Sequence, residues 1–249
     1  SSGTAALHLA YLTVLGEKRV ISLPSVTFVS TASCVLHCNK LPLLQDVDEN
    51  TLINDTFLDV TVDYAGYPTR NGKVIDASQS LRPEMNYGYA QAVTVSLHAT
   101  KGVTTGEGGV VLTDHEDIAE LCKQLRDHGR NDKGECVYPG YNYRLPDLNC
   151  ALGLSQLVSL ESNIRRRREI ARYYHEQFEG LMQLPVSHPT HTWHLYLVRV
   201  KKNRDLFREE LRKQGIGTQM LTPVHMQPWY RNRFGYPESE FPVATDACH

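Results

Sequence analysis

The sequence predicts an α/β fold in which helices flank a mostly parallel sheet. Short apolar runs alternate with helical patterns through residues 1–160, as they do in βα units. Several of these runs are continuous and rich in β-branched residues, which is typical of strands that are covered on both faces. The chain has 249 residues, of which 41% are hydrophobic and 22% charged. This composition excludes a disordered or fibrous protein and allows one large domain or two smaller ones.

The apolar runs and the helical spacing place the expected elements. We expect strands at residues 20–23, 41–47, 60–63, 73–76, 92–97 and 110–112. Helical spacing covers residues 4–15, 28–38, 115–128, 145–160 and 164–181. Prolines and histidines then interrupt the pattern, and a new unit follows with a strand at 194–200, a helix at 204–214 and a strand at 216–221. We therefore expect a large domain over residues 1–163 and a smaller α+β domain over residues 164–249.

Charge and cysteine usage exclude several classes of function. The net charge of −2 predicts no general attraction to nucleic acid or to a membrane surface. The one basic cluster, Arg165 to Arg168, has helical spacing that favours a solvated or interface face. No segment is long and apolar enough to cross a bilayer, and no signal segment opens the chain, so we expect a cytoplasmic protein. Six scattered cysteines without a CxxC pair indicate neither a disulfide framework nor a metal site.

Three features of the sequence carry chemistry. Lys101 lies in SLHATKGVTTGEGG, just past a buried strand, where burial would favour a neutral and nucleophilic amine. Asp76 ends the strand in VIDASQ and would face the crevice in which parallel sheets bind ligands. SSGTAALHLA opens a helix with small residues whose free N–H groups suit a phosphate. Taken singly, each feature has a plain structural alternative: a surface lysine, a helix N-cap or an ordinary capped helix.

Together, the three features match the requirements of pyridoxal phosphate. This cofactor needs a lysine for its Schiff base, a carboxylate beside its pyridine nitrogen and an anion site for its phosphate. The protonated ring then acts as an electron sink, and the released lysine amine shuttles a proton. The sequence therefore indicates a pyridoxal-phosphate enzyme.

The same residues resemble those of the DegT/DnrJ/EryC1/StrS sugar aminotransferases, which are pyridoxal-phosphate enzymes of fold type I. The resemblance also includes LPSVTFVSTA, VDYAGYP, LRDHGR, GYNYRLPDLNCALGLSQL and RRREIARYY, and it spans almost the whole chain. It implies that Lys101 forms the Schiff base, that Asp76 faces the pyridine nitrogen and that Gln79 lies beside the phenolic oxygen. It further implies phosphate contacts from Gly3, Thr4 and Ser96 and stacking by Phe28. Asn142 would reach the phosphate of a neighbouring subunit, so the resemblance implies a homodimer with composite sites.

Within the family, the C-terminal run and the DASQS form are most similar to the branch that makes UDP-4-amino-4,6-dideoxy-N-acetyl-β-L-altrosamine for pseudaminic acid biosynthesis. The implied reaction moves an amino group from L-glutamate to the C4 ketone of a UDP-linked 4-keto-6-deoxy hexosamine. The expected substrate-side residues are Glu107, Tyr143, Arg144, His194, His225 and Tyr230. Each of these also has the plain alternative of an exposed polar residue near a cleft.

Two alternatives stay open: a 3-keto sugar aminotransferase of the same family, and a catalytically idle relative that still binds the cofactor. Lys101 argues against the idle relative, because the dehydratases of the family carry histidine at that position. The chain also departs from the family pattern at residues 69–73, where a crossover helix is expected and five residues are too few. We expect either that the sequence omits stretches of a longer polypeptide or that a helix has been lost and a sheet face exposed.

Overall fold

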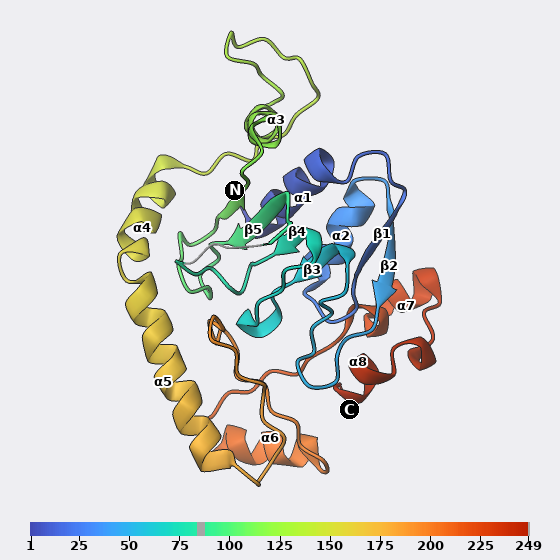
Figure 1. Cartoon of the computed structure of the whole chain (residues 1–249), viewed down its shortest axis with the longest axis vertical. Helices are drawn as coiled ribbons and strands as arrows, with labels where there is room; N and C mark the ends of the chain where they lie inside the picture. Colours follow the sequence, from blue (N-terminus) through green and yellow to red (C-terminus); the bar gives the residue numbers. More distant parts are fainter. Residues whose placement is uncertain (84–87, 249) are drawn as a thin grey trace.

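The computed structural model describes residues 1–83 and 88–248 and confirms the α/β class. Its strands are β1 (Val20–Pro24), β2 (Leu41–Gln45), β3 (Leu58–Val62), β4 (Gly72–Asp76), β5 (Ala92–Ser96) and β6 (Gly109–Leu112). One sheet has the order β3-β4-β5-β6, parallel except for β6, and β1 pairs with β2 in a second parallel pair (Figure 1). All six strands coincide with predicted ones to within two residues at each end.

Helices cover both faces of the four-stranded sheet. Helix α1 (Gly3–Val14) packs against β4, β5 and β6 and buries Tyr11 completely. On the opposite face, Ile75 and Val95 form a cluster with Leu160 and Ile164 of α5 (Leu160–Phe178). Strands covered on both faces are expected to be continuous apolar runs, and β5 fits this expectation because all five of its residues are buried.

A buried carboxylate joins the two sheets side by side. Asp59 of β3 accepts hydrogen bonds from the backbone N–H and the hydroxyl of Ser22 in β1, both at 2.9 Å. The hydroxyl of Ser22 also accepts from the Asp59 N–H at 3.0 Å, and the Lys18 ammonium lies 2.6 Å from the carboxylate. Hydrogen bonds of the Asp59 and Ser22 side chains thus connect β3 to β1, in place of backbone hydrogen bonds between the two strands. As a result, β1 lies next to β3 and the two sheets form one layer.

The connection between β3 and β4 has no helix, and the strand face beneath it is still covered. Residues 63–71 run from one parallel strand to the next with only a 3-10 turn, Tyr64–Gly66. The face they cover is polar: the Thr69 hydroxyl donates to the carboxylate of Asp63 at 2.9 Å and lies 3.0 Å from the hydroxyl of Thr61. All five residues of β3 are buried. The expected exposure of a sheet face is therefore not observed, because a polar loop does the covering.

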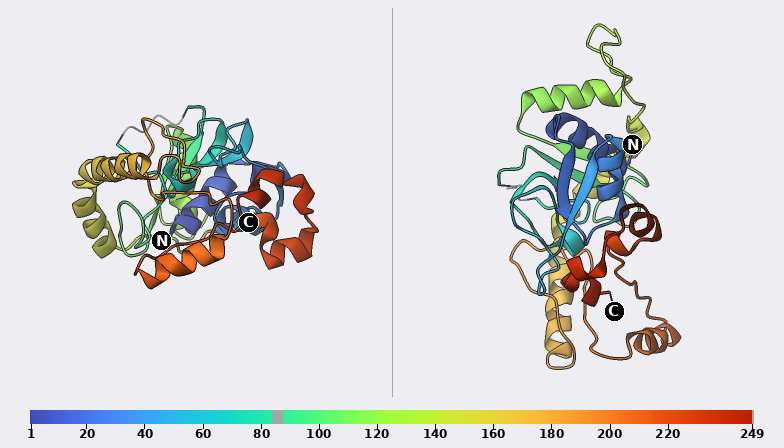
Figure 2. Two further views of the ribbon diagram at one scale, coloured as in Figure 1. Left: turned by 90° about the horizontal axis from the view of Figure 1, so that it is seen from below. Right: turned by 90° about the vertical axis from the view of Figure 1, so that its right-hand side faces the viewer.

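The remaining helices follow the predictions up to residue 214. They are α2 (Val29–His37), α3 (Glu116–Arg126), α4 (Asp147–Leu157) and α6 (Arg204–Lys213). Two short helices were not predicted: α7 (Pro228–Phe234) and α8 (Pro242–Asp246). Helices α4 and α5 run along one side of the molecule towards α6, whereas α7 and α8 lie beside β2 (Figures 1 and 2).

The predicted strands at 194–200 and 216–221 are wrong. After β6, the described residues show no strand, and the isolated bridges there are Asp127 with Asn142, Arg130 with Cys136 and Gln183 with Arg199. The backbone of this segment is bound elsewhere: the Leu195 N–H donates to the Ala65 carbonyl at 3.1 Å. An apolar pattern cannot reveal whether a partner strand is present.

The C-terminal residues do not form a core of their own. Val224, Tyr230 and Phe241 belong to the cluster that also holds Leu23 and Val35 of the N-terminal half. Helix α5 runs across the expected division between residues 163 and 164, so the division into two domains stays a prediction. In the described part of the chain, no helix combines the length and the apolar character that crossing a membrane requires.

We predict that Asp59→Ala lowers the free energy of unfolding by about 2–4 kcal/mol, because it leaves the buried donors of the joint without an acceptor. Burial acts to raise the pKa of Asp59, but hydrogen bonds from Lys18 and Ser22 outweigh it and hold the pKa below its usual range. The contribution should therefore be present at neutral pH and fade as the pH falls below about 4. Urea unfolding at pH 7 and pH 3 measures both effects. Asp205→Ala, in an exposed ion pair, is the control and should change little.

Candidate active site

The carboxyl ends of β4 and β5 bring the expected catalytic residues to one edge of the sheet. Asp76 is the last residue of β4 and Ser96 the last of β5, and the two parallel strands are neighbours. Lys101 follows β5 in a tight turn in which its N–H donates to the His98 carbonyl at 2.9 Å. In open α/β sheets this edge is where ligands bind.

The carboxylate of Asp76 is buried, with 4% of the residue exposed, and is held by two donors. The hydroxyl of Thr31 donates to Oδ2 at 2.7 Å, and the Ser78 N–H donates to Oδ1 at 3.1 Å. A carboxylate has about four lone-pair sites, so each oxygen keeps capacity for a further donor. Asp76 can therefore accept a bond from a ligand without losing its own supports.

Lys101 is half-buried, and burial lowers the pKa of its amine, an effect that the negative charge of nearby Asp76 partly opposes. His194 lies close enough to Lys101 for the two side chains to interact electrostatically. Burial, and then the charges of Lys101 and Arg167, lower the pKa of His194 to about 4, so its ring is neutral at pH 7. The site thus pairs a partly desolvated amine with a buried carboxylate and a neutral imidazole.

The N-terminus of α1 and the end of β5 form a narrow cradle. Gly3 is buried against Ser96: a Cβ added at Gly3 would lie 2.7 Å from the Cβ of Ser96. The first N–H groups of a helix have no partner within the helix. Ser2 caps α1 by accepting from the Ala5 N–H at 3.0 Å, which leaves the N–H groups of Gly3 and Thr4 for an anion.

Two further predicted residues lie on the elements that hold Asp76. Phe28 is the N-cap of α2, next to Thr27, and 66% of the residue is exposed, so its ring is available for stacking. Gln79 follows β4, and its side-chain oxygen accepts from the Ala65 N–H at 2.6 Å. This bond orients the amide so that its NH2 group remains as a donor.

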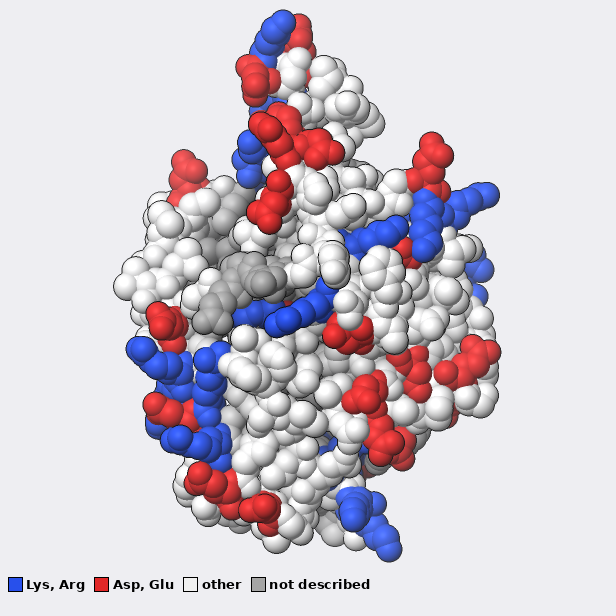
Figure 3. Space-filling model, in the orientation of Figure 1, with Lys and Arg blue, Asp and Glu red and all other residues white. Residues whose placement is uncertain are grey.

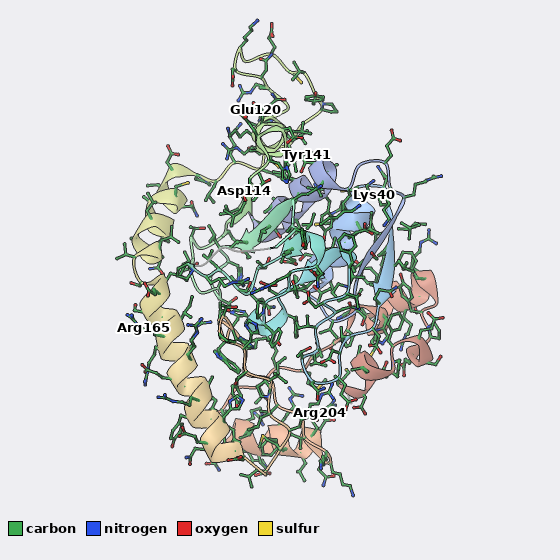
Figure 4. The ribbon with its side chains drawn as sticks, in the orientation of Figure 1. Lys40, Asp114, Glu120, Tyr141, Arg165 and Arg204 are labelled. Carbon is green, nitrogen blue, oxygen red and sulfur yellow. The ribbon has the colours of Figure 1, made fainter. Side chains whose placement is uncertain are left out.

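A small cavity of about 20 Å³ lies beside Lys101. Its polar lining includes Gln79, Thr192 and Arg167 as well as Lys101. The Thr192 hydroxyl donates to the Gln79 carbonyl at 3.0 Å, which joins the C-terminal segment to the end of β4. Arg167 belongs to the basic run of α5 and is half-buried, whereas Arg165, labelled in Figure 4, and Arg166 are exposed. Arg168 donates to the His191 carbonyl at 3.3 Å. Lys and Arg side chains gather on this side of the molecule (Figure 3).

Two predicted substrate residues lie in the packed core instead. His225 is 1% exposed, stacks on Phe241 with 4.4 Å between ring centroids and shares a hydrogen bond of 3.0 Å with Thr245. Tyr230 is 4% exposed, and its hydroxyl lies 2.8 Å from that of Ser33. Neither side chain can reach a ligand without unpacking, so both are corrected to structural residues.

The loop that carries Asn142, Tyr143 and Arg144 lies on the outer side of α1. Tyr143 shares a hydrogen bond of 3.2 Å with His8, and Arg144 pairs with Asp127. Asn142 is exposed and forms an isolated bridge with Asp127. These residues do not join Lys101 within one chain, which leaves Asn142 available to another subunit.

Glu107 is also exposed, and its carboxylate lies 3.7 Å from the His98 ring, in the loop that holds Lys101.

Sequence reasoning missed Thr31, Thr192 and Arg167 as members of this site. Thr31 lies in the first turn of α2 and its hydroxyl contacts that of Thr27, which comes just before the helix, so no local pattern marks this pair. Thr192 and Arg167 come from segments whose approach to Lys101 depends on tertiary packing.

This set of residues fits pyridoxal phosphate. The N–H groups at the start of α1, which Gly3 brings close to the Ser96 hydroxyl, suit a phosphate, and Asp76 offers acceptor capacity to a ring nitrogen. The desolvated amine of Lys101 suits an aldehyde. In the parts of the chain that the structure describes, no group of histidine, cysteine and acidic residues could hold a metal ion.

Comparisons with known proteins agree with this fit. The profile of the DegT/DnrJ/EryC1/StrS aminotransferase family matches residues 1–57 and 74–249. The gap at 58–73 includes the short connection between β3 and β4. An uncharacterized protein of Methanocaldococcus jannaschii is 35% identical over 295 aligned positions, which cover 98% of this chain and 76% of that protein.

Two solved structures share the fold over the whole chain. The Helicobacter pylori aminotransferase PseC, involved in the biosynthesis of pseudoaminic acid, superposes with a TM-score of 0.90 at 27% identity, over 100% of this chain and 78% of that one. S. venezuelae DesV gives a TM-score of 0.89 at 27% identity, over 100% of this chain and 76% of that one.

Proposed function

Because the chain belongs to the DegT/DnrJ/EryC1/StrS aminotransferase family and is a sugar aminotransferase that depends on pyridoxal phosphate, we propose that it transfers the amino group of L-glutamate to a UDP-linked 4-keto-6-deoxy-N-acetylhexosamine. L-Glutamate leaves as 2-oxoglutarate, and the C4 ketone of the sugar becomes an amine. The observation that carries the proposal is the half-buried amine of Lys101 beside the buried carboxylate of Asp76 at one sheet edge.

The residues of the edge have separate roles towards the cofactor. The N–H groups of Gly3 and Thr4 and the Ser96 hydroxyl would bind its phosphate. Asp76 would accept from the ring nitrogen, and the Gln79 amide, held by Ala65, would donate to the phenolic oxygen. When bound, pyridoxal phosphate supplies the carbonyl and the electron sink of the reaction. Lys101 would hold the cofactor through its amine and would serve as the base that moves a proton of the substrate.

Arg167 is suited to the carboxylate of the amino donor. Among the described residues, Arg165 pairs with Glu161 and Arg166 with Glu169, whereas Arg167 makes no ion pair. It lines the cavity beside Lys101 instead. A planar guanidinium binds a carboxylate through two parallel hydrogen bonds, so Arg167 would orient L-glutamate with its amine towards the catalytic lysine.

Amination at C4 is the reaction that the resemblance implies for the pseudaminic acid branch of the family. The similarity to PseC, an aminotransferase involved in the biosynthesis of pseudoaminic acid, supports this branch. His194 is neutral and adjacent to Lys101, and Glu107 borders the same loop, so both remain the substrate-side candidates of this chain. A 3-keto sugar is the alternative substrate, and a catalytically idle cofactor-binding relative is the alternative function. Assays with both ketosugars distinguish the first alternative.

A homodimer with composite sites completes the proposal. Helix α4 and its C-cap expose large apolar side chains: Leu148 and Val158 are each 86% exposed and Leu154 is 69% exposed. Apolar side chains gathered on one helix are typical of an interface. Asn142 and Arg144 lie on the exposed loop before this helix, so a partner subunit could receive them at its own site.

We predict that Lys101→Ala abolishes the visible absorption band expected of the holoenzyme, because it removes the half-buried amine beside Asp76 that would bind the carbonyl. The far-ultraviolet circular dichroism should stay unchanged. In the wild-type protein the band should shift when L-glutamate is added. A band that persists in Lys101→Ala refutes the assignment, and a band that never responds to L-glutamate favours the idle relative.

We predict that Arg167→Gln raises the KM for L-glutamate roughly ten- to hundredfold, since it removes a charge-assisted bidentate contact. The KM for the ketosugar should stay close to the wild-type value. Arg166→Gln is the matched control, because it makes the same substitution at the neighbouring arginine, on the exposed face of α5. Equal effects of the two substitutions on L-glutamate would contradict the role given to Arg167.

We predict that subunits carrying Lys101→Ala and subunits carrying Asn142→Ala, each nearly inactive alone, regain activity when mixed. One of the two sites in each mixed dimer then has a wild-type lysine and a wild-type asparagine. Analytical ultracentrifugation establishes the oligomer, and activity as a function of mixing ratio reports shared sites. If activity fails to return in mixed dimers, Asn142 acts within its own subunit or not at all.

A further inference from the structure

Two buried threonine hydroxyls form a chain that ends on the site carboxylate. The hydroxyl of Thr31 lies 2.7 Å from Oδ2 of Asp76, and the hydroxyl of Thr27 lies 2.7 Å from that of Thr31. Thr31 is fully buried and Thr27 is 4% exposed. Water therefore has little access to these bonds, and the residues that make them must satisfy one another.

The chemistry of the groups fixes the direction of the bonds. An ionised carboxylate only accepts, so Thr31 must use its single proton towards Asp76. The contact between the two hydroxyls then requires Thr27 to donate and Thr31 to accept. The result is a one-way chain from Thr27 through Thr31 to Asp76.

The backbone around Thr31 keeps its hydroxyl in this direction. Thr31 lies in the first turn of α2, where its N–H bonds the Phe28 carbonyl at 3.1 Å. The buried hydroxyl of Tyr11 donates to the Thr31 carbonyl at 3.1 Å, which ties α2 to α1. A β-branched side chain has few rotamers in a helix, so the hydroxyl is set by the fold and not by the ligand.

We propose that Thr31, supported by Thr27, is a positioning residue for the cofactor: its hydroxyl holds the Asp76 carboxylate in the rotamer that meets the pyridine nitrogen. The inference rests on the proposed placement of Asp76 opposite that nitrogen. The Ser78 N–H holds the other oxygen, so the carboxylate is fixed at both ends before the cofactor arrives. Orienting a group in advance lowers the entropic cost of binding.

The test compares two cofactors that differ in one atom. Pyridoxal phosphate and its analogue with carbon in place of the ring nitrogen share the phosphate, the aldehyde and the shape. We measure the dissociation constant of each for the apoprotein by titration calorimetry. The dissociation constant of the analogue divided by that of pyridoxal phosphate reports the strength of the contact between Asp76 and the ring nitrogen. In the wild-type protein this ratio should strongly favour pyridoxal phosphate.

Thr31→Val should lower this ratio roughly three- to tenfold, because the carboxylate must now be immobilised by the ligand itself. Thr31→Ser, which keeps the hydroxyl, should restore the wild-type ratio. Thr13→Val is the matched control: it removes a hydroxyl that bonds the Leu9 carbonyl of α1, away from Asp76. Equal weakening of both cofactors by Thr31→Val, or no weakening of either, overturns the proposal.

Two further variants remove the remaining ambiguities. If Thr31→Val does not fold, Thr27→Val tests the same chain, and it should lower the ratio in the same direction by a smaller factor; an unchanged ratio overturns the proposal. Asp76→Asn tests the placement on which the inference rests. If Asp76→Asn lowers the ratio and Thr31→Val does not, the proposed function stands and only the role of Thr31 is lost. If Asp76→Asn leaves the ratio unchanged, the placement of Asp76 itself is refuted.

Discussion

Burial makes opposite demands on the two charged groups of the site, and the sheet edge has to meet both. The amine of Lys101 needs partial desolvation, which lowers its pKa, while the adjacent negative charge of Asp76 acts against this shift. A buried carboxylate, in contrast, is costly unless donors surround it. The chain supplies donors from Thr31 and Ser78 to Asp76, whereas among the described residues no acceptor forms a hydrogen bond with the Lys101 amine. The carboxylate is thus held by hydrogen bonds, while burial lowers the pKa of the Lys101 amine.

The parallel pairing of β4 and β5 brings the residues of the site together at one edge of the sheet. Because β4 and β5 run in the same direction and in register, Asp76 lies opposite Thr94, and Ser96 ends two residues further on. Helix α1 crosses the same strands and brings Gly3 against Ser96, so the anion cradle and the carboxylate are fixed by one packed layer. An error in register would separate the phosphate position from the ring position, and the burial of β5 on both faces specifies that register.

The sequence predicted the elements that depend on local pattern and failed where tertiary partners decide. All six strands and the helices up to residue 214 follow from apolar periodicity. Lys101, Asp76 and the glycine turn at Gly3 follow from their places at strand and helix ends, and the family resemblance adds Ser96; the structure gathers them at one edge. The segments 194–200 and 216–221 have a strand-like pattern, but their backbone groups found other partners. His225 and Tyr230 are polar residues that pack inside, and no local signal distinguishes a packed histidine from a ligand.

The short connection between β3 and β4 explains how distant segments reach the site without a helix there. A helix in this position would satisfy its own backbone groups internally, whereas the loop offers them outward. The Ala65 N–H orients Gln79, and the Gly66 carbonyl accepts from the Thr192 N–H at 3.0 Å. Gly66 has a φ of +96°, and a Cβ there would collide with the Thr192 side chain, so the close approach requires glycine. The loop therefore serves as the junction through which the C-terminal segment, with His194, is brought next to Lys101.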